Sequence, residues 1–180
     1  MRTGSTAPEL DVSGWLQGLP VTLAELRGRV VMLETFQMLC PGCVAYGLPL
    51  AQRVHRSFPS TDVTVIGLHT VFEHHDVMGR DALAAFVSEY QLEFPIAIDR
   101  HENDPVPVTM QRYQLRGTPS TVLIDRDGRI AHSAFGAFDE LALGAQIGRL
   151  LTEHPTPGAA PTQPAPHDAP VCEPGRPCVG

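Results

Sequence analysis

The chain has 180 residues, 43% of them hydrophobic and 18% charged, which is the composition of a globular protein and excludes wholesale disorder. Thirteen basic residues, all of them arginine, stand against twenty acidic ones and give a formal net charge of −7. Sequence-independent nucleic-acid binding requires clustered positive charge, and no apolar run approaches the roughly 20 residues of a membrane span. We therefore expect no nucleic-acid partner and no membrane insertion.

The beginning of the chain contains an arginine but no apolar stretch of the length that secretory signal peptides carry, roughly 7–15 residues. This pattern predicts a cytoplasmic protein. In a reducing cytoplasm, neighbouring cysteines are expected to serve catalysis or metal binding rather than structure.

The sequence divides into a globular body at residues 1–151 and a tail at residues 152–180. Proline recurs every two to four residues in the tail, and no apolar periodicity continues into it. Such a composition predicts an extended or disordered segment rather than part of a core.

Strands and helices are expected to alternate within the body. Strands rich in apolar residues are predicted at 29–36, 62–68 and 96–98, and helices at 41–57, 81–90 and 109–115. A hairpin follows at 120–125 and 129–135 around an Asp-Gly turn, and an amphipathic helix at 139–151 closes the domain. A βαβ unit, an antiparallel hairpin and a last helix predict an α/β fold with a mixed central sheet and helices on both faces.

The residue pattern that carries chemistry is Cys40-Pro41-Gly42-Cys43, at the junction of a predicted buried strand and a predicted helix. The helix N-terminus favours a thiolate at Cys40, and Pro41 suits the first helical turn because no N–H is needed there. Cys40 would attack a substrate disulfide and Cys43 would resolve the mixed disulfide. A pair with this spacing is also compatible with half of a zinc site, with inert thiols, or with a binding module that holds partners or metal without catalysis.

Four stretches together resemble the thioredoxin fold, most closely the TlpA/ResA-like (redoxin) branch of the thiol–disulfide oxidoreductases. They are residues 7–10 with 21–28, the Cys40–Cys43 motif, Gly117-Thr118-Pro119, and residues 123–130. The resemblance implies a thioredoxin-like fold with an N-terminal β-hairpin extension. It also implies exchange with protein or low-molecular-weight disulfides, a thiol or thioredoxin-type electron donor, and no cofactor, because the cysteines hold the electrons.

The resemblance assigns roles to residues other than the two cysteines. Pro119 would be a cis-proline beside the disulfide, and Thr118 would expose its backbone to an extended substrate, with Pro41 and Gly42 completing the substrate groove. Glu34, six residues before Cys40, matches a buried aspartate of thioredoxins that is thought to move protons to and from the inner cysteine. The other interpretation of Glu34 is a carboxylate paired with a neighbouring arginine.

The sequence departs from the family at two places near the motif. Leu39 replaces the aromatic residue that commonly precedes the first cysteine, and Pro-Gly stands between the cysteines.

The rival class is a peroxiredoxin-like thiol peroxidase, whose reactive cysteine lies in Pro-x-x-x-Thr-x-x-Cys. Counting back from Cys40, that pattern requires Pro and Thr where this chain has Leu33 and Gln37.

Two weaker patterns leave alternatives open. His69, His74 and His75 could tune the Cys40 thiolate, bind metal, or belong to an ordinary polar loop, and we assign no metal site to them. Cys172 and Cys178 flank a Pro-Gly turn in the tail and could form a secondary redox pair, a static disulfide loop, a metal site or two spectator thiols.

Overall fold

Six strands form one mixed sheet in the order β1-β4-β3-β2-β5-β6 in the computed structural model, which describes residues 3–152 and Gly175. Strands β2, β3 and β4 are parallel, whereas β5 runs antiparallel to β2 and β6 antiparallel to β5. The strands are β1 (Val12–Gln17), β2 (Val30–Phe36), β3 (Val63–His69), β4 (Ile96–Asp99), β5 (Ser120–Ile124) and β6 (Ile130–Phe135). The predicted mixed sheet is confirmed.

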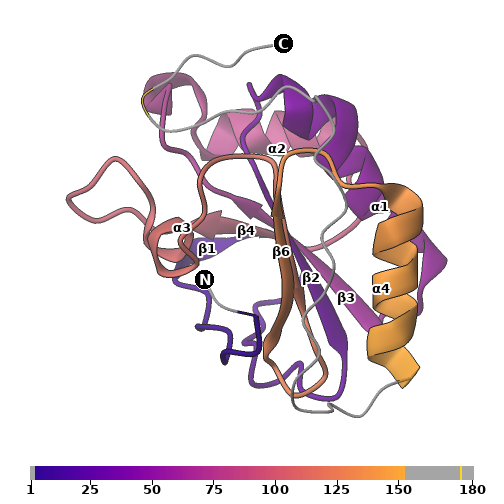
Figure 1. Ribbon diagram of the computed structural model, residues 1–180. Helices are drawn as coiled ribbons and strands as arrows, with labels where there is room; N and C mark the ends of the chain where they lie inside the picture. Colours follow the sequence, from indigo (N-terminus) through magenta and orange to yellow (C-terminus); the bar gives the residue numbers. More distant parts are fainter. Residues whose placement is uncertain (1–2, 153–174, 176–180) are drawn as a thin grey trace.

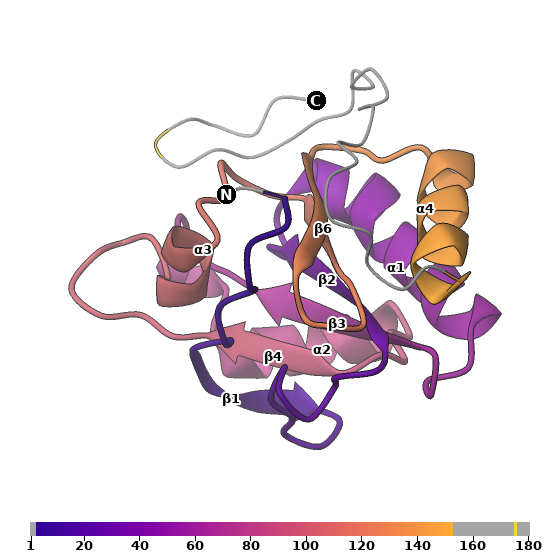
Figure 2. The ribbon, with the colours of Figure 1, turned by 60° about the horizontal axis from the view of Figure 1, so that its bottom comes forward.

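Six helical segments connect and cover these strands. They are η1 (Cys43–Gly47), α1 (Leu48–Ser57), η2 (His75–Val77), α2 (Arg80–Glu89), α3 (Val108–Arg112) and α4 (Glu140–Thr152). Helices α1 and α4 lie side by side (Figures 1 and 2), and Arg53 and Glu140 form an ion pair between them. None of the helices within residues 3–152 is both long and apolar enough to cross a membrane.

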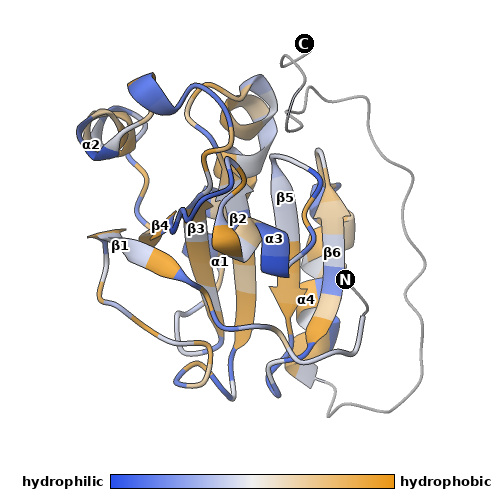
Figure 3. Ribbon diagram, turned by 90° about the vertical axis from the view of Figure 1, so that its left-hand side faces the viewer, coloured by the Kyte–Doolittle hydropathy of each residue, from blue (hydrophilic) through white to orange (hydrophobic). Residues whose placement is uncertain are grey.

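The two faces of the sheet carry separate apolar clusters, because successive side chains of a strand point to opposite faces. On one face Met32 and Phe36 of β2 pack with residues of α1, α2 and α4. On the other face Val31 and Leu33 pack with the N-terminal segment and with Tyr113, which follows α3. Figure 3 shows the hydrophobic colouring concentrated in the central strands. The central strand β2, which leads to the cysteines, is buried along its whole length.

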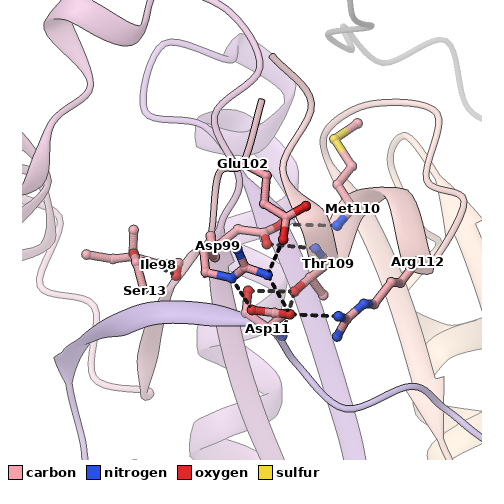
Figure 4. A network of polar contacts seen from close by, with 9 residues as sticks. Asp11, Ser13, Ile98, Asp99, Glu102, Thr109, Met110 and Arg112 are labelled. Atoms are coloured by element: carbon pink, nitrogen blue, oxygen red, sulfur yellow. Dashed lines mark hydrogen bonds and ion pairs between the residues drawn. The ribbon is translucent and has the colours of Figure 1, made fainter. Parts of the chain in front are cut away.

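The N-terminal extension differs from the predicted hairpin. Its strand β1 pairs antiparallel with β4, in a register that places Trp15 opposite Ala97, and it becomes the edge of the main sheet. Asp11 attaches this segment by ion pairs to Arg100 and Arg112 (Figure 4). The extension pairs with a distant strand because that edge of the parallel sheet would otherwise leave backbone groups unpaired.

The predicted boundary near residue 151 agrees with the end of α4 at Thr152. The predicted tail lies outside the described residues, apart from Gly175. Its cysteines, Cys172 and Cys178, lie outside them as well.

Candidate active site

The buried strand β2 delivers the cysteine pair to the start of a helix. After Phe36 the chain turns through residues 37–39 and enters a continuous helical segment at residue 41. The buried Gln37 side chain ties this turn to the loop after β3, because its Oε1 accepts a hydrogen bond from the Phe72 N–H at 3.1 Å and its amide reaches Glu73 at 3.3 Å. These bonds tie the turn before the cysteines to the loop after β3.

Cys40 lies where hydrogen-bond donors converge on its sulfur. The backbone N–H of Cys43 donates to Cys40 Sγ at 3.3 Å, and the sulfur lies 3.4 Å from the Thr118 carbonyl oxygen. A hydrogen bond from the Cys43 thiol is the strongest influence on the pKa of Cys40. Together with the N–H groups of Gly42 and Cys43, it lowers that pKa to about 7 against the opposing effect of burial. Cys40 therefore holds a substantial thiolate fraction at neutral pH.

Cys43 has the opposite character. Burial, the hydrogen bond to Cys40 and the charge on that sulfur raise the pKa of the Cys43 thiol well above its ordinary value. Both cysteines are reduced in this structure. The pair thus combines a sulfur that ionises readily with one that needs a base before it can react.

The loop before β5 borders the pair. The Thr118–Pro119 peptide bond is cis, and Thr118 is buried with its backbone carbonyl next to the sulfur of Cys40. The structure therefore brings Thr118 and Pro119 to the cysteines, as it does Pro41 and Gly42. Their roles in substrate binding stay predictions.

Glu34 is completely buried in the middle of β2, on the sheet face that packs against the cysteine helix. Its Oε2 accepts a hydrogen bond from the Thr121 hydroxyl at 2.6 Å, whereas Oε1 has no hydrogen-bond partner. Burial raises the pKa of the Glu34 carboxyl to about 8, with a contribution from Cys40, although the Thr121 bond opposes this. Among the described residues no arginine forms a hydrogen bond or ion pair with this carboxyl, which contradicts the arginine-paired interpretation there.

The surface around the pair is apolar and partly exposed. Leu39 is 54% exposed and Tyr46 45% exposed, and Pro41 is also exposed, whereas the Cys40 side chain itself is covered. The sulfur of Cys40 is therefore buried in this structure.

The three histidines singled out in the sequence do not form one cluster. His69 is buried beside the Phe36 ring, and burial lowers its pKa to about 4, so its imidazole is neutral. His74 is exposed, and the His75 ring contacts His101 instead. His69, His75 and His101 line a cavity of about 400 Å³. Within the described part of the chain, no group of three or more His, Cys, Asp or Glu side chains is arranged to hold a metal ion.

Sequence reasoning missed two residues of the site, Thr121 and Gly47. Thr121 holds the Glu34 carboxyl, and Gly47 touches it, since a Cβ on Gly47 would lie 2.4 Å from Glu34 Oε1. A glycine inside a predicted helix is unfavourable and often has a packing or functional reason, so Gly47 did carry a signal. Thr121 carried none, because its contact joins strands that lie 87 residues apart in sequence.

Alkylation of the reduced protein by iodoacetamide tests the two thiols directly. We expect Cys40 to react first, with a pH midpoint near 7, and Cys43 to stay unmodified up to much higher pH. In Cys43→Ala the midpoint for Cys40 should rise, because the donor thiol is lost. Mass spectrometry assigns each adduct. A Cys40 midpoint at the ordinary value of 9.0 would contradict the geometry described here.

Comparison with known proteins decides the family. Residues 3–133 match the model of the AhpC/TSA family. The chain belongs to the AhpC/TSA family. It is also similar to the thiol–disulfide oxidoreductase ResA of Bacillus thuringiensis, with 27% identity over 136 residues that cover 76% of this chain and 71% of ResA.

The chain is also similar to solved structures, at higher sequence identity than to ResA. A thiol–disulfide isomerase from Corynebacterium glutamicum superposes with a TM-score of 0.79 and 49% identity, over 82% of this chain and 98% of that one. A thioredoxin-like superfamily protein superposes with a TM-score of 0.81 and 50% identity, over 83% of this chain and 98% of that one. The domain is thus a thiol–disulfide oxidoreductase domain of the redoxin type with a Cys-x-x-Cys pair, and its thioredoxin-like fold is confirmed.

Another relative is much longer than this chain. The DipZ protein of Mycobacterium bovis is 29% identical over 165 residues, which cover 89% of this chain and only 22% of DipZ. The chain therefore spans about a fifth of the length of DipZ.

Proposed function

We propose that the protein exchanges disulfides with protein substrates through the Cys40-Pro41-Gly42-Cys43 pair. The observation that carries the proposal is the arrangement of the two sulfurs: Cys40 Sγ accepts the Cys43 N–H at 3.3 Å at the start of the helix, and Cys43 is buried one turn further in. The pKa values of the two thiols follow from this arrangement. The pKa of Cys40 is lowered to about 7, and that of its neighbour Cys43 is raised far above its ordinary value. A structural disulfide or a pair of inert thiols needs no such difference, whereas a nucleophile and a resolving thiol do.

The reaction with a substrate disulfide has two steps. The Cys40 thiolate attacks one substrate sulfur, a mixed disulfide forms, and the other substrate sulfur leaves as a thiolate. Cys43 then loses its proton and attacks the Cys40 sulfur, which breaks the bond to the substrate and releases its second thiolate. The two electrons of the dithiol pass to the substrate, and the Cys40–Cys43 disulfide remains until a thiol or thioredoxin-type donor reduces it.

Glu34 is the proposed acceptor of the Cys43 proton. Its carboxyl is buried on the side of the sheet that carries the cysteine helix, and a pKa of about 8 allows it to exchange a proton near neutral pH. Because Oε2 is occupied by Thr121, Oε1 is the oxygen available for this transfer.

An extended segment of a protein substrate fits the surroundings of the pair. Leu39, which precedes Cys40, and Tyr46 of η1 offer exposed apolar surface. The Thr118 carbonyl contacts the sulfur of Cys40, and we assign Thr118 and Pro119 the placement of the substrate backbone. The partners are therefore a protein carrying a disulfide and a dithiol donor.

Peroxidase chemistry has less support from the same residues. A peroxidase must orient the peroxide with a hydroxyl near the reactive cysteine, and the residue at the matching position is Gln37. The Gln37 side chain is buried and engaged by Phe72 and Glu73, so it offers no free group to a peroxide.

A trapping experiment with insulin as the disulfide substrate tests the proposed function. The Cys43→Ser variant should accumulate a mixed disulfide between Cys40 and insulin, because the resolving step is blocked, while the unaltered protein turns insulin over with dithiothreitol as reductant. Cys40→Ser should form no adduct at position 43, since the remaining thiol is not ionised.

The double variant Cys40→Ser/Cys43→Ser is the control for the tail cysteines. Absence of turnover by the unaltered protein would favour the binding-module alternative. An insulin adduct on Cys172 or Cys178 instead of Cys40 would also overturn the assignment.

A further inference from the structure

The helix that begins at the cysteine pair has an irregular first part. Residues 43–47 form a π-helical turn, in which the N–H of Leu48 donates to the carbonyl oxygen of Cys43, five residues earlier. Regular α-helix begins at Leu48. Single π-turns inside α-helices are rare and occur frequently at functional sites. Gly47 is the last residue of this turn, four residues after Cys43.

The backbone does not require glycine at this position. Gly47 has φ −61° and ψ −55°, ordinary helical values that any residue adopts. Glycine in a helix is less favourable than alanine. A reason for glycine here must therefore lie in the space around it rather than in its conformational freedom.

That space is taken by Glu34 and Pro119. A Cβ on Gly47 would lie 2.4 Å from Glu34 Oε1, 3.4 Å from Glu34 Cδ and 2.9 Å from Pro119 Cβ. A real Cβ does not approach another heavy atom so closely, so an alanine would have to displace one of these groups. Glu34 is confined as well, because Oε2 is tied to Thr121 at 2.6 Å and its side chain has no exposed surface.

We propose that Gly47 is a positioning residue that allows a glutamate, rather than a shorter acid, to place its free carboxyl oxygen beneath the cysteine helix. Gly47 and Glu34 are matched in size: the missing side chain on the helix makes room for the carboxyl that reaches it from β2. The inference rests on the proposed role of Glu34 as proton acceptor. The oxygen that Gly47 contacts is Oε1, the one without a hydrogen-bond partner and hence the one that takes the Cys43 proton.

Four variants test this size match: Gly47→Ala, Glu34→Asp, the double variant Gly47→Ala/Glu34→Asp, and Gly148→Ala. The last is the matched control, a glycine in α4 with nothing within 4 Å of an added Cβ. The readout is the rate at which Cys43 resolves the mixed disulfide between Cys40 and an insulin peptide, measured from pH 6 to 9.

We expect Gly47→Ala to slow resolution at pH 7 by about tenfold or more and to move the pH profile, because the proton acceptor is displaced. The double variant should regain most of this loss, since aspartate is one methylene shorter and leaves room for the Cβ. Gly148→Ala should match the unaltered protein. A rate for Gly47→Ala within twofold of the unaltered protein, or a double variant as slow as Gly47→Ala, would overturn the size match.

Folding of the variants, measured by circular dichroism, decides the remaining case. If Gly47→Ala fails to fold but the double variant folds and resolves, the contact with Glu34 is the critical one and the proposal stands. If neither folds, the contact with Pro119 dominates and the proposal fails.

Failure of the proposed disulfide exchange can be distinguished from failure of the size match between Gly47 and Glu34. If the exchange fails, the unaltered protein itself forms no mixed disulfide. The infrared band of the protonated Glu34 carboxyl, which should titrate near pH 8, then provides the test. The proposal requires this midpoint to move in Gly47→Ala and not in Gly148→Ala.

Discussion

Glu34→Gln should make the protein progressively more stable than its parent as the pH rises from about 4.5 to 8. The pKa of the Glu34 carboxyl is raised by burial from its ordinary value of 4.5 to about 8, so the folded protein holds a proton that the unfolded chain has released. The free energy of unfolding of the parent therefore falls with pH across this window, and glutamine, which does not ionise, escapes the loss. Each pH unit contributes at most about 1.4 kcal/mol, so the difference reaches roughly 4–5 kcal/mol above pH 8.

Urea denaturation at a series of pH values measures this effect, and it is best done in a Cys40→Ser/Cys43→Ser background so that thiol titration does not contribute. Glu25→Gln is the control, because Glu25 is exposed and its pKa is lowered by hydrogen bonds from Thr22, so its ionisation is complete below this window. A difference between Glu34→Gln and its parent that does not change from pH 5 to 8 would show that Glu34 ionises normally in the fold.

The same substitution has a separate consequence for the reaction when the cysteines are intact. Glutamine cannot accept the Cys43 proton, so the mixed disulfide should be resolved more slowly. Unchanged turnover at every pH would exclude Glu34 as the proton acceptor even if the stability result held.

The central part of the fold was predictable from local pattern. The apolar, β-branched run of β2, the hairpin with Asp127-Gly128 at its turn and the amphipathic α4 each specify an element within a few residues. The cysteine spacing and its place between strand and helix indicated the chemistry as well, because helix N-termini favour thiolates whatever the rest of the protein does. The predicted burial of Glu34 also followed from its place in an otherwise apolar strand.

Features that depend on contacts between distant segments were not predictable in this way. The predicted N-terminal hairpin was wrong, because β1 pairs with β4, with Val12 opposite Asp99 far along the chain. No local signal in the sequence distinguishes that sheet edge from a hairpin partner. The π-turn and the contact between Gly47 and Glu34 were missed, since both depend on the space left between a helix and a strand after packing. His69 was named for its chemistry, but its neutral, buried state follows from packing on Phe36.

Asp99→Ala should destabilise the fold by about 3–4 kcal/mol, a large part of the usual stability of a domain. Asp99 is buried at the end of β4, where its carboxyl accepts hydrogen bonds from the Thr109 N–H at 2.9 Å and the Met110 N–H at 3.1 Å (Figure 4). It also accepts one from the Thr70 hydroxyl at 2.9 Å. The two N–H groups belong to the first turn of α3, where a helix has no internal acceptors for them. Alanine would leave all three buried donors without a partner, and each costs roughly 1–3 kcal/mol, although removal of a buried carboxylate recovers part of the loss.

Asp104→Ala is the matched control for this substitution. Asp104 also accepts a backbone hydrogen bond, from the Val106 N–H at 2.8 Å, but it is exposed, so water can replace it and the expected change is within about 0.5 kcal/mol. Urea denaturation at pH 7 compares the two, with the cysteine pair reduced in both. Because Asp99 is the last residue of β4 and pairs with Val12 of β1, its loss should loosen that edge of the sheet first, and amide hydrogen exchange should show lower protection in β1 and α3 than in β2. Equal effects of the two substitutions would mean that α3 is held by its apolar contacts, chiefly Met110, rather than by the carboxyl of Asp99.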